Sequence, residues 1–207
     1  DVLARDLDAV RASLGVERVA VLGYSIAGAL AVEYGRRCPG SVSHVILAGT
    51  PPSGDMGRLA AASTRFFEED GSEERKQILR ENMSRLPPGT PPQQAVLAQT
   101  PMRFFDPRTD VAPLYGEAEV NPRLFNHVLG TLVTGWDITS DPGSLGVPIF
   151  IAHGRYDYVV PHAMWDGIVD RLPNTTFRLF ERSGHQPFFE EPQRFADVVG
   201  EWMNTRQ

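Results

Sequence analysis

Residues 19–28 combine a short apolar run, one serine between small side chains, and the start of a helix. The run Val19–Leu22 is continuous, which is typical of a strand buried on both faces. Ser25 follows it, with Gly23 two residues before and Ala27 two residues after. Only small side chains fit these flanking positions when a strand turns sharply into a helix around a serine. The pattern therefore predicts a strained turn that lifts the Ser25 hydroxyl out of a sheet.

The same turn would place the backbone N–H of Ile26 at the N-terminus of a helix. Such an N–H group can bind an oxyanion. The side chain of Tyr24, next to the serine, is a candidate for lining a pocket. Trp136 is a second candidate, although a tryptophan in such a position more often belongs to the core.

Strand-like and helix-like segments alternate at both ends of the chain. Short apolar runs predict strands, and apolar residues at helical spacing predict helices. The alternation predicts an α/β fold with a mostly parallel sheet and right-handed crossovers. Besides 19–22, the predicted strands are 42–48, 147–154 and 175–180, and the predicted helices are 1–14, 26–37, 161–172 and 192–203.

The alternation is lost between about residues 53 and 144. This part contains proline-rich breaks and helical patches, the first of which, residues 66–81, is strongly charged. Its glutamates are expected to form a solvated surface. Residues 93–105 and 121–133 look like further helices. We therefore predict two units, an α/β core from residues 1–52 and 145–207 and a helical cap from residues 53–144 that covers the serine.

Composition narrows the possible partners and compartments. A formal net charge of -6 argues against a nucleic-acid partner. The single cysteine, Cys38, cannot form an internal disulfide and fits a reducing compartment. No signal peptide or membrane-spanning run is visible, so we expect a cytoplasmic protein with no membrane partner. The histidines show no metal-ligand spacing, and we expect neither a metal nor another cofactor.

Three chemically suited residues follow three of the predicted strands. Ser25 follows the first strand, Asp157 the third and His185 the fourth. Catalytic groups on a parallel sheet collect at the carboxyl ends of its strands. A histidine can remove the proton from a serine hydroxyl near pH 7, and a carboxylate on its other nitrogen fixes the tautomer. His153, at the end of the third strand, is expected to have a packing or hydrogen-bonding role.

The chain resembles the C-terminal two-thirds or more of an α/β-hydrolase. The order Ser, Asp, His is that of this fold. The style is similar to that of proline iminopeptidase and related small-molecule hydrolases, which carry a helical cap between the same strands. The resemblance implies that Ser25 is the nucleophile, Asp157 the acid and His185 the base, and that the cap shapes the substrate pocket. The segments that carry it are Leu22–Gly28, Val42–Pro51, His153–Pro161 and Ser183–Phe195.

Two features depart from the family pattern. The opening strands of the family, and the loop that gives its second oxyanion N–H, have no counterpart in these residues. We therefore expect a partner, the N-terminal segment of the same protein in the same or a separate chain, because an apolar sheet edge is otherwise exposed. The paired Trp and Glu residues expected in the cap of a true proline iminopeptidase are also absent. The segment Gly135-Trp136-Asp137 matches that motif only in part.

The expected function is therefore that of a serine hydrolase. It would cleave an ester or amide bond of a small molecule through an acyl-enzyme, with an aminopeptidase-like activity as one possibility. Two alternatives remain open at this point. One is a lyase or cofactor-free oxygenase of the same fold, which would use the serine without an acyl-enzyme. The other is a non-catalytic module that binds a ligand in the cap pocket.

Overall fold

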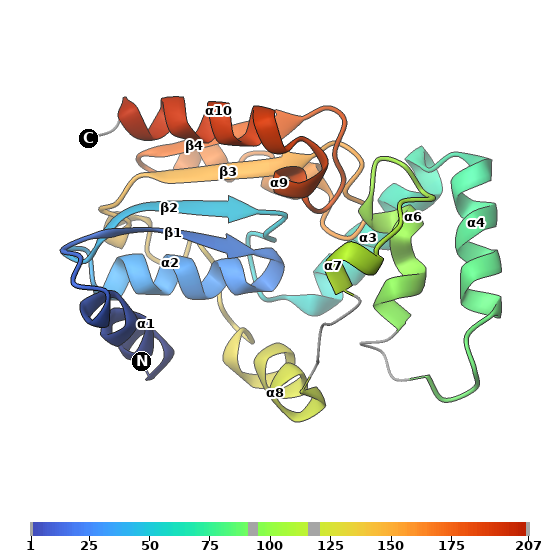
Figure 1. Ribbon diagram of the computed structural model, residues 1–207, viewed down its shortest axis with the longest axis horizontal. Coiled ribbons are helices and arrows are strands. Elements are labelled where there is room, and N and C mark those ends of the chain that lie inside the picture. Colours follow the sequence, from blue (N-terminus) through green and yellow to red (C-terminus); the bar gives the residue numbers. More distant parts are fainter. Residues whose placement is uncertain (1, 91–94, 116–120, 206–207) are drawn as a thin grey trace.

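A computed structural model describes residues 2–90, 95–115 and 121–205. Its centre is a sheet of four parallel strands in the order β1-β2-β3-β4 (Figure 1). The strands are β1 (Val19–Tyr24), β2 (Val42–Ala48), β3 (Ile149–Gly154) and β4 (Thr175–Phe180). The predicted α/β class with a parallel sheet is confirmed.

Helices cover both faces of this sheet, with α10 (Pro192–Asn204) on one face and α1 (Val2–Ser13) and α2 (Gly28–Arg37) on the other (Figure 1). Successive strand residues point to opposite faces. Accordingly, Ile46 and Phe150 pack with Trp202 of α10. On the other side, the main core joins buried residues of β2 and β3 to α2 and includes Val45, Leu47, Ile149, Ile151, Val32 and Tyr34.

Strand β1 is an edge strand with one poorly covered face. Leu22 pairs in register with Ile46, which places it on the α10 side of the sheet. The α10 helix packs over Ile46 and Phe150 but leaves Leu22 45% exposed. Ala20 is exposed as well. The prediction that residues 19–22 are buried on both faces is therefore wrong for this chain, because the cover on one side ends at β2.

Helix α1 also leaves apolar side chains in solvent. Its bounds agree with the predicted helix, but its buried residue is Ala4. Leu3, Val10 and Leu14 are 42%, 57% and 67% exposed. The apolar spacing thus predicted the helix correctly, but most of that apolar face is uncovered.

The segment 53–144, which we call the cap segment, lies mostly beyond the carboxyl ends of the strands (Figure 1). Its described elements are α3 (Met56–Asp70), α4 (Glu73–Ser84), η2 (Val96–Gln99), α6 (Thr100–Arg103), α7 (Ala112–Tyr115), α8 (Pro122–His127), the π-turn η3 (Val128–Leu132) and η4 (Pro142–Ser144).

Two predicted cap helices are each divided in the structure. The patch 66–81 spans the end of α3 and most of α4, because Gly71 adopts an extended conformation and Ser72 caps α4 by accepting a hydrogen bond from Arg75 N. Within 93–105, residues 93–94 lie outside the described residues, residues 96–103 form η2 followed by α6, and Phe104 is extended. The third patch, 121–133, is helical through α8 and η3.

The predicted helix 161–172 is wrong. The structure contains two short 3-10 turns there, η5 (His162–Trp165) and η6 (Val169–Arg171). Between them Asp166 is extended and Gly167 has a φ of 68°, which interrupts any α-helix. Trp165 is nevertheless almost fully buried, and its indole N–H donates to Thr50 O at 3.0 Å.

The C-terminal part continues from β4 through a short helix α9 (Pro187–Glu190) into α10. The described residues 2–90, 95–115 and 121–205 contain no helix that is long and apolar enough to cross a membrane.

Candidate active site

Ser25 occupies a sharp turn between β1 and α2. Its φ of 52° lies in the left-handed region, which side chains other than glycine rarely adopt. The preceding Tyr24 is extended, and Ser25 opens the 3-10 turn η1 (Ser25–Ala27) that leads into α2. The strain predicted for this turn is therefore present, and it is confined to the residue that carries the hydroxyl.

Two glycines allow this turn to pack closely. A Cβ atom on Gly23 would lie 2.5 Å from the Cα of Gly28, and one on Gly28 would lie 2.2 Å from the Thr50 Oγ1 atom. Both distances are far shorter than van der Waals contact. The small residues around Ser25 are thus required by the contact between β1, α2 and the end of β2.

The Ser25, His185 and Asp157 side chains form one hydrogen-bonded chain. The His185 Nε2 atom lies 3.0 Å from Ser25 Oγ, and its Nδ1 atom lies 2.7 Å from Asp157 Oδ2. Since a carboxylate only accepts, Nδ1 carries the proton and Nε2 is left to accept from the serine hydroxyl. His185 and Asp157 are fully buried. This arrangement has the geometry in which a histidine can remove a serine proton.

Asp157 is held in place by its own loop. Its Oδ1 atom accepts hydrogen bonds from the backbone N–H groups of Val159 and Val160, at 3.0 and 2.8 Å. These two bonds fix the orientation of the carboxylate, so that Oδ2 faces His185.

His153 lies beside Asp157 at the end of β3. Its Nε2 atom is 2.6 Å from Val160 O, so this nitrogen donates a proton to a carbonyl. The same Nε2 is 3.4 Å from Asp157 Oδ2. Burial lowers the pKa of His153, which keeps the ring neutral. His153 thus has the expected hydrogen-bonding role, and its ring lies next to Asp157.

The His185 loop is packed against the end of β2. Gly49 has a φ of 57°, and a Cβ atom there would lie 2.6 Å from His185 O and 2.8 Å from its Nδ1. Only a glycine permits this approach. Gly49 therefore fixes how close His185 comes to the sheet.

Tyr24, a predicted pocket residue, borders the same site. Its ring centroid is 5.1 Å from that of His185, and its hydroxyl accepts a hydrogen bond from Gln186 Nε2 at 2.9 Å. Gln186 also bonds the Tyr115 hydroxyl from α7. Burial raises the pKa of Tyr24, so it remains a neutral phenol. Gln186 and Tyr115 were not predicted, although Gln186 directly follows His185.

The other two predicted residues differ in position. Ile26 is half-buried in η1, directly after Ser25. Trp136 is half-buried and packs against the main core, which is the more common position for such a residue. Its indole nitrogen is buried without a hydrogen-bond partner among the described residues.

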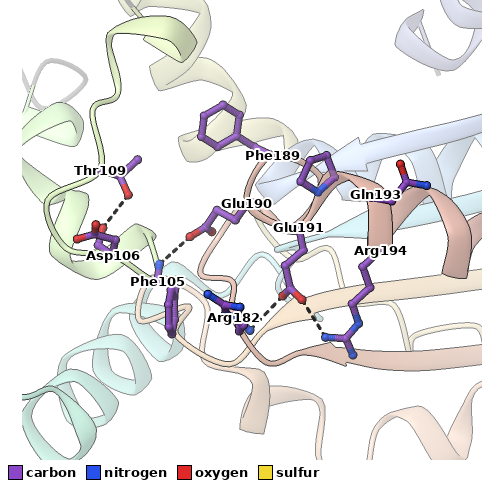
Figure 2. A pocket seen from close by; sticks show the side chains of 10 residues that line it. Phe105, Asp106, Thr109, Arg182, Phe189, Glu190, Glu191, Gln193 and Arg194 are labelled. Carbon is purple, nitrogen blue, oxygen red and sulfur yellow. Dashed lines mark hydrogen bonds and ion pairs between the residues drawn. The ribbon is translucent and has the colours of Figure 1, made fainter.

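A cavity of about 580 Å³ lies between the cap segment and the α9–α10 region (Figure 2). Phe105, Arg182, Phe189 and Glu190 contribute to its lining. Ser25 does not line it. The cavity is therefore distinct from the place where the serine hydroxyl meets His185.

Serine, histidine and aspartate in this geometry, at the carboxyl ends of a parallel sheet, are typical of hydrolases of α/β architecture. The comparison with known families agrees, because residues 1–192 match the family described as "alpha/beta hydrolase fold". The chain belongs to this family.

The most informative relatives are bacterial. The chain is 30% identical to AB hydrolase superfamily protein YclE of Bacillus subtilis (strain 168), over 99% of this chain and 75% of that protein. It is 24% identical to the proline iminopeptidase of Heyndrickxia coagulans, over 99% of this chain and 73% of that enzyme. The expected resemblance to proline iminopeptidase is confirmed.

Solved structures show the same fold. VinJ superposes with a TM-score of 0.74 at 21% identity, covering 99% of this chain and 72% of that one. Proline iminopeptidase of Mycobacterium smegmatis superposes with a TM-score of 0.59 at 24% identity, covering 98% and 70%.

Proposed function

We propose that this protein is a serine hydrolase that cleaves an ester or amide bond of a small molecule through an acyl-enzyme. The observation that carries the proposal is the continuous chain of hydrogen bonds from Ser25 Oγ through His185 to Asp157. Among the relatives, the proline iminopeptidases support an amide bond as the bond that is cleaved, and a methyl ester esterase supports an ester bond.

The proposed reaction has two halves, the formation of the acyl-enzyme and its hydrolysis by water. Ser25 Oγ attacks the substrate carbonyl carbon while His185 Nε2 takes the hydroxyl proton. Asp157 stabilises the resulting imidazolium, and the Ile26 N–H donates to the oxyanion. His185 then gives its proton to the leaving group as the carbonyl–leaving-group bond breaks. In the second half, His185 takes a proton from water as the oxygen of that water attacks the acyl carbon. The bond between the acyl carbon and Ser25 Oγ then breaks, His185 returns the proton to Oγ, and the carboxylic acid leaves.

We further propose that the cap segment shapes the substrate pocket. Tyr115 of α7 meets Gln186 next to His185, so one cap residue already borders the site. Pocket shape, rather than the triad itself, selects the substrate in such folds. An aminopeptidase-like specificity is the form of this proposal that the proline iminopeptidase relatives favour.

The exposed edge of β1 supports the expectation of a partner. Leu22 is half-exposed on a strand that pairs on one side only within the described residues. We infer that a further strand, from the same polypeptide or another, covers this edge. A monomeric, cooperatively melting and active protein consisting of residues 1–207 alone would contradict this inference.

The first experiment is mass spectrometry of the intact protein before and after reaction with a fluorophosphonate probe. One adduct per chain, located on Ser25 and lost in Ser25→Ala, is expected. His185→Gln should slow the reaction by several orders of magnitude. Correctly folded protein that acquires no adduct would contradict the acyl-enzyme and favour a ligand-binding module. An adduct without turnover of esters or amides would favour a lyase or oxygenase.

A further inference from the structure

One short stretch of the cap segment, residues 102–105, contacts both loops that carry the proposed acid and base. The backbone N–H of Tyr158, directly after Asp157, donates to Met102 O at 3.0 Å. The backbone N–H of His185 donates to Arg103 O at 2.6 Å. The same stretch is therefore a common support for the two loops.

Glu190 joins this stretch to the His185 loop a second time. Its Oε1 atom accepts from Phe105 N at 2.6 Å, a bond drawn in Figure 2, and its Oε2 atom accepts from Gly184 N at 2.7 Å. Each carboxylate oxygen thus binds a different segment. Gly184 directly precedes His185, so the carboxylate lies one residue from the proposed base.

The two segments touch through their backbones. A Cβ atom on Gly184 would lie 2.2 Å from Arg103 O. A shift of either backbone would therefore be transmitted to the other. His185 lies at this contact, and its ring must remain within hydrogen-bond reach of Ser25.

The cap side of the contact is fixed by Arg75 of α4. Its buried guanidinium donates to the carbonyls of Pro101, Phe104 and Phe105, at 2.6, 2.8 and 2.7 Å. Three charge-assisted bonds to one short stretch restrict its movement. Glu190 therefore connects the His185 loop to a support that is itself held firmly.

We propose that Glu190 is a positioning residue, whose carboxylate holds the His185 loop against residues 103–105 and so sets the distance between His185 and Ser25. The role of this distance in catalysis rests on the proposed serine hydrolase function. The position of His185 itself can be measured without it.

Several charged groups surround the Glu190 carboxylate. Burial raises its pKa to about 7, against the opposing effect of its backbone donors, and the charge of Asp157 adds to the rise. Arg75 interacts with it from α4, and Asp106, Arg182, Glu191 and Arg194 line the adjoining cavity. His185 is the titratable group of the loop that it holds. The carboxylate should therefore be only partly ionised near neutral pH.

The test compares Glu190→Gln with Glu181→Gln. Glutamine preserves the size of the side chain but replaces one acceptor oxygen with an NH₂ group, which cannot accept from an N–H. Glu181 pairs with Arg155 on the surface and serves as the matched control. We expect Glu190→Gln to slow fluorophosphonate labelling of Ser25 by about 10- to 100-fold, because small misplacements of catalytic groups cost this much. Glu181→Gln should label at the wild-type rate.

The dependence on pH separates positioning from a general loss of stability. In the wild type, ionisation of Glu190 should promote labelling, so the pH dependence of the labelling rate should include a rise near pH 7. In Glu190→Gln this contribution should be absent. Glu190→Asp retains a carboxylate, but its shorter side chain should reach only one of the two partners, Phe105 N or Gly184 N, so an intermediate labelling rate is expected. If Glu190→Gln does not fold, Glu190→Asp is used for the test in its place.

Proton NMR of the His185–Asp157 hydrogen bond provides a readout that does not depend on hydrolysis. Its low-field Nδ1–H resonance should shift or broaden in Glu190→Gln and remain unchanged in Glu181→Gln. If the wild type gave this resonance but did not label, the proposed function would fail while the role of Glu190 would still be decided by NMR. A folded Glu190→Gln with the wild-type resonance and labelling rate would overturn the inference.

Discussion

The Nε2 atom of His153 lies 3.4 Å from Asp157 Oδ2, the oxygen that binds His185. His153 is fully buried and neutral, and its Nε2–H also donates to Val160 O. A polarised N–H group therefore lies next to the Asp157 carboxylate. The environment of Asp157 thus includes one histidine that faces the serine and one that does not.

We expect His153→Phe to slow fluorophosphonate labelling of Ser25 by about 10-fold, because the loop that carries Asp157 loses the hydrogen bond from His153 Nε2 to Val160 O. His127→Phe, on an exposed position of α8, provides a matched control that should label at the wild-type rate. A wild-type rate in folded His153→Phe would contradict a role for His153 in holding the Asp157 loop.

Gly28→Ala should destabilise the protein, although alanine normally favours a helix. The new Cβ would lie 2.2 Å from Thr50 Oγ1, so the free energy of unfolding should fall by about 1–3 kcal/mol. Gly200→Ala in α10 meets open space and should raise it by about 0.5–1 kcal/mol. Urea unfolding of both variants measures the contrast, and equal effects would contradict the close packing described.

Ser25→Gly should be more stable than Ser25→Ala. Both variants lack the hydroxyl, but only glycine adopts a φ of 52° without steric cost. The difference in the free energy of unfolding should be about 1 kcal/mol, after the greater flexibility of unfolded glycine is subtracted. Thermal unfolding of the two inactive proteins measures it. Equal stabilities would mean that the turn stores no strain.

The stability of the protein should depend on the ionisation of Glu190. Folding raises the pKa of this carboxyl from 4.5 to about 7, so the folded state binds the proton more tightly than the unfolded state. Its contribution to stability is fully present below pH 4.5 and is lost as the pH rises through about 7, by up to roughly 3 kcal/mol. The free energy of unfolding of the wild type, relative to that of Glu190→Gln, should therefore be higher at pH 5 than at pH 8.5. A difference that did not vary with pH would contradict the raised pKa.

Much of the fold could be predicted because it depends on local sequence. The predicted strands 42–48 and 175–180 have the bounds of β2 and β4. Ser25, Asp157 and His185 could be grouped before their contacts were known, because each follows the end of a parallel strand. The proposed roles of these three residues remain predictions until they are tested.

Other features depend on contacts between distant parts of the chain. Arg75 belongs to a charged patch that looked solvated, yet it is only 5% exposed because it binds cap carbonyls about 30 residues away. Glu190 and Glu191 are adjacent and identical in type. The sequence does not distinguish them, but in the fold Glu190 binds the cap segment at Phe105 and Glu191 binds Ser183. Leu22 has the sequence of a buried strand residue and becomes exposed through its place at the sheet edge.

The stretch 102–105 has a consequence for the two loops that it supports. Its carbonyls receive the N–H groups of Tyr158 and His185 in the arrangement seen here. A movement of the cap segment that carried this stretch away would break both bonds at once. The loops that carry the proposed acid and base would then lose a shared support together, so a disturbance of the cap would reach both partners of the relay as a single event.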